Sequence, residues 1–413
     1  MGSYNLAHGS EFSEEQKWEW FYFHIHKPLI IALTTLVHWL GLSAYWFIIP
    51  YLFYFLSSIL LFLFLRDKVD GKIVLFGSVL VLMFNSVWMY FGTHLLPDIP
   101  VATCLLAMVY FLDRAVRTDG SFSKKDWYLT ILFAALTTLF RIEFLIAAAV
   151  PLLYYIYIKY NRQINANSVG KALADKEVRK YVGVFVLILL LFFLLYIFLI
   201  EKTPNFWEYP SIVFEQISNV RTETGEIGAN KSNLLYALSE TAFSFILLPF
   251  LVACAGLYLI VNRRAVQLYP AALLFCLLFL ESTFLTFFYH GEQRYMTRLF
   301  PLLTIFLAYF VDRLLKLKQL SDETYRRAAA ITIMLLLLYS SHYAVHSIIP
   351  GGGVVGIYDV RMMTIYVPGF DALEVDKYDA TEDGYFFIRE MIHKYEGNFD
   401  DVFTLSLIHI SEP

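Results

Sequence analysis

Charged side chains are scarce in this chain of 413 residues, and their scarcity is its most informative property. Lys, Arg, Asp and Glu together make up 16% of the residues, whereas 58% are hydrophobic and 18% are aromatic. This composition lies outside the range of soluble domains and is typical of proteins that cross a membrane several times. The formal net charge is −4, which gives no indication of a nucleic-acid partner.

Several familiar motifs are also absent. The sequence contains neither a P-loop nor an HExxH motif, so an ATP-driven pump and a zinc protease have no support. The chain has three cysteines, Cys104, Cys254 and Cys276, and each lies inside an apolar run. Their spacing fits neither a disulfide framework nor a metal site, and we expect them to be small buried hydrophobic residues.

Long apolar runs dominate what is present, and many approach the ~20 residues that a helix needs to cross a bilayer. We predict an all-α polytopic membrane protein, a bundle of about ten spans. They lie near 45–65, 73–92, 99–113, 127–141, 143–159, 181–200, 236–261, 268–288, 299–312 and 328–346. Only Arg141–Glu143 separates the fourth stretch from the fifth, so these two are either separate spans or one bent, re-entrant unit.

Basic residues alternate from one connection to the next. One set of connections holds nearly all of them: Arg66, Lys68, Lys72, Arg114, Arg117, Lys124, Lys125, Lys159, Arg162, Lys171, Lys176, Arg179, Lys180, Arg263, Arg264, Arg313, Lys316, Lys318, Arg326 and Arg327. By the positive-inside rule this set is cytoplasmic. The other face is then extracytoplasmic, in the plasma membrane of a prokaryote.

Three regions follow from this topology. Residues 1–44 are predicted to form an extracytoplasmic loop with an interfacial or re-entrant helix that begins at Pro28. Residues 45–346 form the transmembrane domain, and 347–413 a small extracytoplasmic α/β piece. The start lacks a signal peptide and reads like the middle of a loop, so we expect a preceding span to be missing. Residues 406–413 resemble translated sequencing-adaptor read-through, and we expect the native domain to continue.

The stretch Tyr289–Pro301 places an unusual group of polar residues between two apolar runs. It contains His290, Glu292, Arg294, Tyr295 and Arg298. Charges at a membrane edge usually bind or react with something. Two interpretations are open for the arginines. They either contact lipid headgroups as anchors, or form a site for a phosphate, to which Arg presents a bidentate fork.

Asp98 is the acid that is most informative, since it lies between Pro97 and Pro100 directly before a span, four residues after His94. Its carboxylate is either a solvated cap of the following helix or a rigidly held group that orients or deprotonates an acceptor hydroxyl. Arg141 and Glu143 interrupt an apolar stretch, and they form either a mutual structural pair or further headgroup contacts.

Two further segments carry polar or aromatic groups on the same predicted face. His24, His26 and Lys27 precede Pro28, and two histidines do not make a metal site, so we expect contacts with the lipid interface or a phosphate. The loop around Trp207 suits an interfacial aromatic belt better than sugar stacking.

Taken in order, these residues resemble the membrane glycosyltransferases of the GT-C fold, such as protein O-mannosyltransferases and aminoarabinose transferases. The matching stretches are His24–Leu29 for an H-x-KPP-L pattern, Asp98 before a span, Leu139–Glu143 for L-T-R-x-E, and Arg294–Pro301 for R-Y followed by Pro. Each stretch alone is weak, and the ordered set is moderately specific. One departure matters: the family's first-loop acidic motif should precede Tyr4, where this sequence has no acid.

The resemblance implies transfer of a hexose or pentose from a polyprenyl-phosphate donor, such as dolichyl-phosphate mannose, to a protein, lipid or glycan hydroxyl in the cell envelope. It implies an inverting reaction in which Asp98 is the surviving acid. Lys27, His94, Arg141, Glu143, His290, Glu292, Arg294, Tyr295 and Arg298 would bind substrate. We expect no cofactor; metal dependence varies within this fold class, and the sequence offers no convincing ligand set.

Two other classes of protein remain open. A transporter or flippase for lipid-linked or small anionic substrates would also place arginines near a membrane site, but should show internal repeats and broken spans. No repeat is apparent in the sequence. A structural or sensory membrane protein would leave the one-sided grouping of polar residues unexplained.

Overall fold

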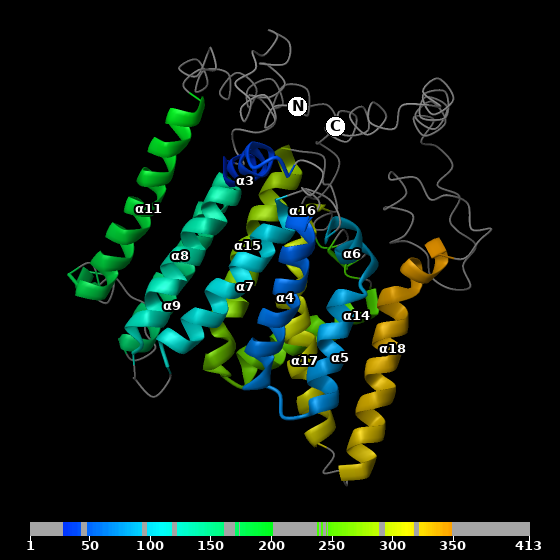
Figure 1. Ribbon diagram of the computed structural model, residues 1–413. Coiled ribbons are helices and arrows are strands. Elements are labelled where there is room, and N and C mark those ends of the chain that lie inside the picture. Colours follow the sequence, from blue (N-terminus) through cyan, green and yellow to red (C-terminus); the bar gives the residue numbers. More distant parts are fainter. Residues whose placement is uncertain are drawn as a thin grey trace, which may run out of the picture. The chain divides into compact units, whose positions relative to one another are not determined.

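The structure is a computed structural model (Figure 1). It describes residues 28–42, 48–92, 97–117, 122–160, 170–172, 174–200, 238, 241–242, 245, 247–288, 294–317 and 322–348. The chain divides into two units, Gly2–Ser341 and a second unit of Met1 with His342–Pro413. In the second unit, only the last turns of one helix lie in the described part, so the predicted α/β piece at 347–413 is almost wholly outside it.

The described residues are helical, and they contain no β-strand beyond an isolated bridge between Val116 and Phe122. The α-helices are α3 (Pro28–Trp39), α4 (Ile48–Arg66), α5 (Lys72–Met83), α6 (Ser86–Gly92), α7 (Asp98–Ala115), α8 (Lys124–Phe140), α9 (Ala149–Lys159), α11 (Lys176–Ile200), α14 (Leu247–Asn262), α15 (Tyr269–Phe288), α16 (Arg294–Thr297), α17 (Phe300–Leu317) and α18 (Asp322–Ile348). The 3₁₀ segments η2 (Ile142–Ala148) and η5 (Val266–Leu268) precede α9 and α15.

Local chemistry explains where several helices begin and end. The side chain of Ser123 accepts a hydrogen bond from the backbone N–H of Asp126 and so caps α8. The stretch 73–92, expected as one span, is instead two helices with a break at Asn85. The Asn85 side chain accepts a hydrogen bond from the backbone N–H of Trp88 at 3.0 Å, which starts α6 afresh.

Helices α7 and α17 lie at the centre of the unit. Almost every side chain of α7 is buried, and the helix lies against α4 on one side and α8 on the other. Helix α17 lies between α14 and α5. Gly256 in α14 permits a very close approach, because a Cβ at this position would lie 2.0 Å from the carbonyl oxygen of Phe306 in α17.

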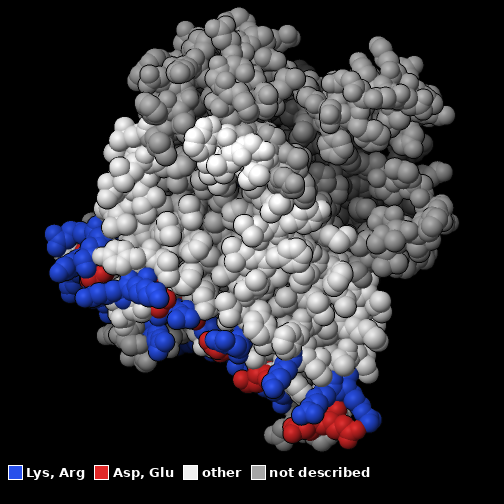
Figure 2. All heavy atoms as spheres, viewed as in Figure 1, with Lys and Arg blue, Asp and Glu red and all other residues white. Residues whose placement is uncertain are grey.

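Charged residues gather along one edge of the described surface, as Figure 2 shows. We call this edge the basic end; it is formed by the connections 66–72, 115–124, 159–176, 262–269 and 317–322. These are the connections that the sequence predicts to be rich in Lys and Arg. Their ion pairs join separate helices, as between Lys68 and Asp113 at 2.7 Å, or between Lys316 and Asp312 at 2.8 Å.

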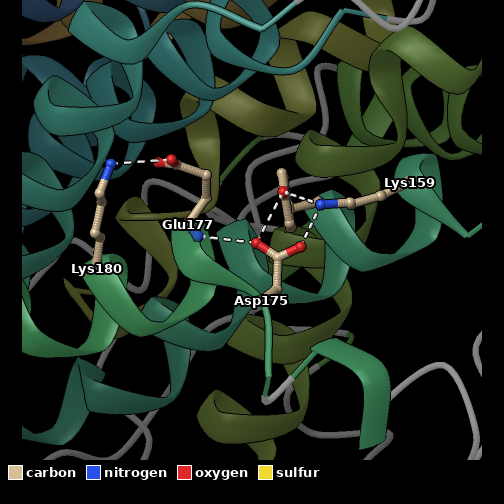
Figure 3. A network of polar contacts seen from close by, with 5 residues as sticks. Lys159, Asp175, Glu177 and Lys180 are labelled. Atoms are coloured by element: carbon tan, nitrogen blue, oxygen red, sulfur yellow. Dashed lines mark hydrogen bonds and ion pairs between the residues drawn. The ribbon is translucent and has the colours of Figure 1, made fainter.

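Asp175 organises one corner of the basic end (Figure 3). Its carboxylate pairs with Lys159, accepts a hydrogen bond from Tyr155 at 3.2 Å, and accepts another from the backbone N–H of Glu177 at 2.8 Å. Burial raises the pKa of Asp175, but the hydrogen bonds from Lys159 and Glu177 outweigh it, so the pKa lies below its ordinary value. The start of α11 is thereby fixed to the end of α9.

One helix in the described part, Ile48–Arg66, is long and apolar enough to cross a membrane by itself. Shorter apolar helices occur at Lys72–Met83, Phe144–Lys159, Leu247–Asn262 and Val266–Glu281. The predicted count of about ten spans therefore stays a prediction. One expectation is wrong: Cys104 is buried, but Cys254 is only partly buried and Cys276 is exposed, because it faces outward from α15.

Candidate functional site

A small set of charged residues lies away from the basic end. Among the described residues, these are Asp98, Arg141, Glu143, Glu281, Arg294 and Arg298. They come from the start of α7, the junction of α8 and η2, the second half of α15, and the segment around α16. Helix alternation brings these positions to the end of the bundle opposite the basic end (Figure 1). We call this the site end.

The best-defined contact at the site end is the ion pair of Asp98 and Arg141. Arg141 Nη1 donates a hydrogen bond to Asp98 Oδ1 at 2.9 Å, and the side chains are 6% and 1% exposed. Pro97 immediately precedes α7 and places Asp98 in its first turn, while Arg141 sits in extended backbone between α8 and η2. Asp98 is therefore not the solvated cap that one interpretation of the sequence favoured.

Phe144 joins this pair to a second arginine. The guanidinium carbon of Arg298 lies 4.3 Å from the centroid of the Phe144 ring, and that of Arg141 lies 5.6 Å from the same centroid. Both distances are within the range of a cation–π interaction. Phe144 is fully buried, and Arg298 is 1% exposed. The structure thus groups Asp98, Arg141 and Arg298 around one aromatic ring.

The segment that carries Arg298 is held from several sides. α16 contacts both α6 and α7. Met296 accepts a hydrogen bond from the Thr241 hydroxyl at its sulfur, 3.2 Å away. Directly after Arg298 and Leu299, Phe300 lies against Phe245 and Trp88, with ring centroids 5.1 and 6.2 Å apart. The position of Arg298 is therefore fixed by buried packing rather than by an exposed loop.

The remaining predicted site residues are less defined. Lys27, His94, His290 and Glu292 lie outside the described residues. Glu143, Arg294 and Tyr295 lie in described backbone, in η2 and α16, but their side chains are not described. The predicted pairing of Arg141 with Glu143 is thus untested, although Arg141 does have Asp98 as a partner. Arg294 and Tyr295 lie one turn or less from Arg298.

Two residues at the site end were missed by the sequence analysis. Phe144 is one aromatic residue among many, and only its contacts distinguish it. Glu281 is an acid inside the apolar stretch of α15, and both of its carboxylate oxygens are inaccessible to solvent. A single acid twelve residues into an apolar helix was the signal that could have found it, because ionisable residues in such helices usually have functional roles.

This arrangement has clear chemical capabilities. Two guanidinium groups near one ring can hold an anion such as a phosphate, since each offers several N–H donors. Arg141 donates to Oδ1 of Asp98, and no hydrogen bond to Oδ2 is found among the described residues. The second oxygen can therefore accept a proton or a hydrogen bond from a hydroxyl. A site of this kind in a helical membrane bundle suits chemistry on a lipid-borne anion.

Comparison with known families supports the same class. Residues 26–196 match the model of the dolichyl-phosphate-mannose-protein mannosyltransferase family. The matched region contains Asp98, Arg141 and Phe144, and it ends before Glu281, Arg294 and Arg298. Nothing matched in the searches of curated proteins and of solved structures. This part of the chain is thus similar to a membrane glycosyltransferase family of the GT-C type.

Proposed function

We propose that this protein is a membrane glycosyltransferase. It transfers a sugar from a polyprenyl-phosphate donor to an acceptor hydroxyl at the extracytoplasmic face of the membrane. The observation that carries the proposal is the grouping of Asp98, Arg141 and Arg298 around Phe144, at the end of the bundle away from the basic connections. The family match over residues 26–196 supports it.

In this proposal the arginines bind the phosphate of the donor. Arg298 faces the phosphate, and the adjacent residues Arg294 and Tyr295 complete its surroundings. When the bond between the sugar C1 and the phosphate oxygen breaks, the electron pair moves to that oxygen, and the phosphate gains one negative charge. A guanidinium already in place stabilises this developing charge.

Asp98 acts as the general base. The acceptor oxygen forms a bond to C1 on the face opposite the leaving phosphate, so the anomeric configuration is inverted. The hydroxyl proton passes to Oδ2 of Asp98, while Arg141 keeps Oδ1 and fixes the orientation of the carboxylate. Arg141 is in this sense a positioning residue for Asp98.

A transporter or flippase for lipid-linked anions is the alternative. It also requires basic residues that face a lipid phosphate. It does not require a carboxylate that is fixed by an arginine next to an aromatic ring, whereas acceptor deprotonation does. The lack of an internal repeat in the sequence further favours the transferase.

A transfer assay distinguishes these functions. The purified protein is reconstituted into vesicles with a tritiated mannosyl polyprenyl phosphate and a detergent extract of envelope proteins and glycans as acceptor. The transferase proposal expects label to enter the fraction insoluble in chloroform, with one free polyprenyl phosphate formed for each sugar transferred. Label that stays on the lipid while it changes leaflet would instead establish a flippase and overturn the proposal.

A further inference from the structure

Glu281 is the one described acid at the site end, apart from Asp98 and Glu143, and no role has been assigned to it above. It lies in α15, which contacts α7, η2 and α17. These three elements carry or adjoin Asp98, Phe144 and Arg298. Both Glu281 carboxylate oxygens are inaccessible to solvent.

The position of Glu281 on its helix directs it toward the interior. Ala271, Leu274 and Leu278 are completely buried and follow one another at spacings of three and four residues. Glu281 continues this series after three more residues. Positions with these spacings share one face of an α-helix. The carboxylate thus extends the buried face of α15, while Cys276 and Leu280 lie on its exposed face.

The height of Glu281 in the bundle follows from a ring contact. Phe275 in α15 and Phe306 in α17 lie with ring centroids 5.5 Å apart. The two helices run in opposite directions (Figure 1). From this contact, six residues along α15 lead to Glu281 and six residues back along α17 lead to Phe300, about 9 Å in each case. Glu281 is therefore level with Phe300, and Arg298 lies two residues beyond.

Charged neighbours of Glu281 can come only from a few elements. In the described parts of its contacting elements, α14 and η5 have no charged residue, and Lys159, Asp312, Arg313 and Lys316 lie at the basic end. The site-end charges are Asp98, Arg141, Glu143 and Arg298. Asp98 and Arg141 already form a 2.9 Å ion pair. This leaves Arg298 as the described cation whose level matches Glu281.

We infer that Glu281 is the counter-charge of Arg298 and a positioning residue for phosphate release. This inference rests on the proposed function. With no phosphate bound, the carboxylate balances the guanidinium stacked on Phe144. With the product polyprenyl phosphate bound, the carboxylate repels the phosphate, because two like charges in a poorly screened site oppose each other. Glu281 thereby keeps Arg298 from holding the product too tightly.

The substitution Glu281→Gln tests this directly, because it removes the charge and nearly keeps the shape. We expect binding of farnesyl phosphate to detergent-solubilised protein to become about tenfold tighter, a change of ~1.4 kcal/mol. In the transfer assay, KM for the donor and kcat should fall together, so that kcat/KM changes little. A merely structural role would instead weaken binding. Unchanged or weaker binding by Glu281→Gln therefore overturns the inference.

A second pair of variants separates this inference from the proposed function. Arg298→Gln should lose farnesyl phosphate binding at least tenfold, and adding Glu281→Gln to it should have no further effect, because the two side chains act on each other. If Arg298→Gln binds like the parent, the phosphate role of Arg298 and with it the proposed function fails. If Arg298→Gln loses binding and Glu281→Gln still strengthens binding to the same extent in that background, only the inference about Glu281 fails.

Discussion

Asp98 and Arg141 are 43 residues apart in the chain, yet their side chains form a 2.9 Å ion pair that is almost completely buried. A buried ion pair does not stabilise a fold by much, because the loss of hydration opposes the attraction. Its retention in a nearly charge-free interior is better explained by function. The same helix offers a natural comparison, since Asp113 at the other end of α7 pairs with Lys68 at the basic end.

The first prediction concerns these two acids. Asp98→Asn should lower the rate of sugar transfer by ~10²–10⁴-fold, the range for loss of a general base. It should also lower the free energy of unfolding by about 3 kcal/mol, because Arg141 stays buried without its counter-charge. The measurements are initial rates in reconstituted vesicles and thermal unfolding in detergent.

Asp113→Asn is the matched control for this prediction. It breaks an ion pair on the same helix and should lower stability, but leave the transfer rate per folded molecule within about twofold, since Asp113 is far from the site end. If both variants lose activity to the same degree, the effect of Asp98→Asn is one of stability, and Asp98 is not the base.

A second prediction tests the packing between α14 and α17. Gly256→Ala should lower the free energy of unfolding by about 1–3 kcal/mol, because the new methyl group would collide with the Phe306 carbonyl and force the helices apart. Gly183→Ala in α11 is the control, since nothing lies within 4 Å of a Cβ there. It should be neutral or stabilise the helix by up to ~1 kcal/mol. Equal midpoints for both variants in thermal unfolding would mean that α14 and α17 do not approach this closely.

A third prediction concerns pH. The pKa of Asp175 lies below its ordinary value in the folded protein, because hydrogen bonds from Lys159 and Glu177 outweigh the effect of burial. Its stabilising contribution should therefore be complete above the unfolded pKa of ~3.9, and should be lost as the pH falls through the folded pKa. Thermal unfolding of the parent and of Asp175→Asn should differ at pH near 6, and the difference should shrink in acid.

Asp67→Asn serves as the comparison for Asp175. Asp67 pairs with Arg66 on the exposed surface, with side chains that are 68% and 53% exposed. Exposed pairs contribute ~0–1 kcal/mol, so this variant should unfold like the parent at every pH. A difference between parent and Asp175→Asn that grows as the pH falls would contradict the account of the Asp175 network.

The sequence predicted the helices well because their lengths follow from the apolar runs. The stretches 99–113 and 127–141 correspond to α7 (Asp98–Ala115) and α8 (Lys124–Phe140), and the helix expected to begin at Pro28 does so. The break at Asn85 was missed, because it depends on one side chain that caps the next helix rather than on hydrophobicity.

The candidate site was only partly predictable. Asp98, Arg141 and Arg298 stood out as charges next to apolar runs, but their partners depend on which helices meet. The sequence suggested Glu143 for Arg141, whereas the structure pairs Arg141 with Asp98. Phe144 and Glu281 were overlooked, because an aromatic residue or one acid within an apolar run acquires meaning only from its neighbours in the folded chain.

The most direct test of the central claim is whether Arg298 binds a lipid-borne phosphate. Binding of a polyprenyl phosphate to the purified protein in detergent should weaken at least tenfold in Arg298→Lys, because Lys cannot reproduce the planar fork that stacks on Phe144. The matched control is Arg313→Lys, since Arg313 stacks on Tyr309 at 5.3 Å near the basic end, and it should bind like the parent. Equal affinity of the parent and both variants would contradict the claim that the site end holds the phosphate of the donor.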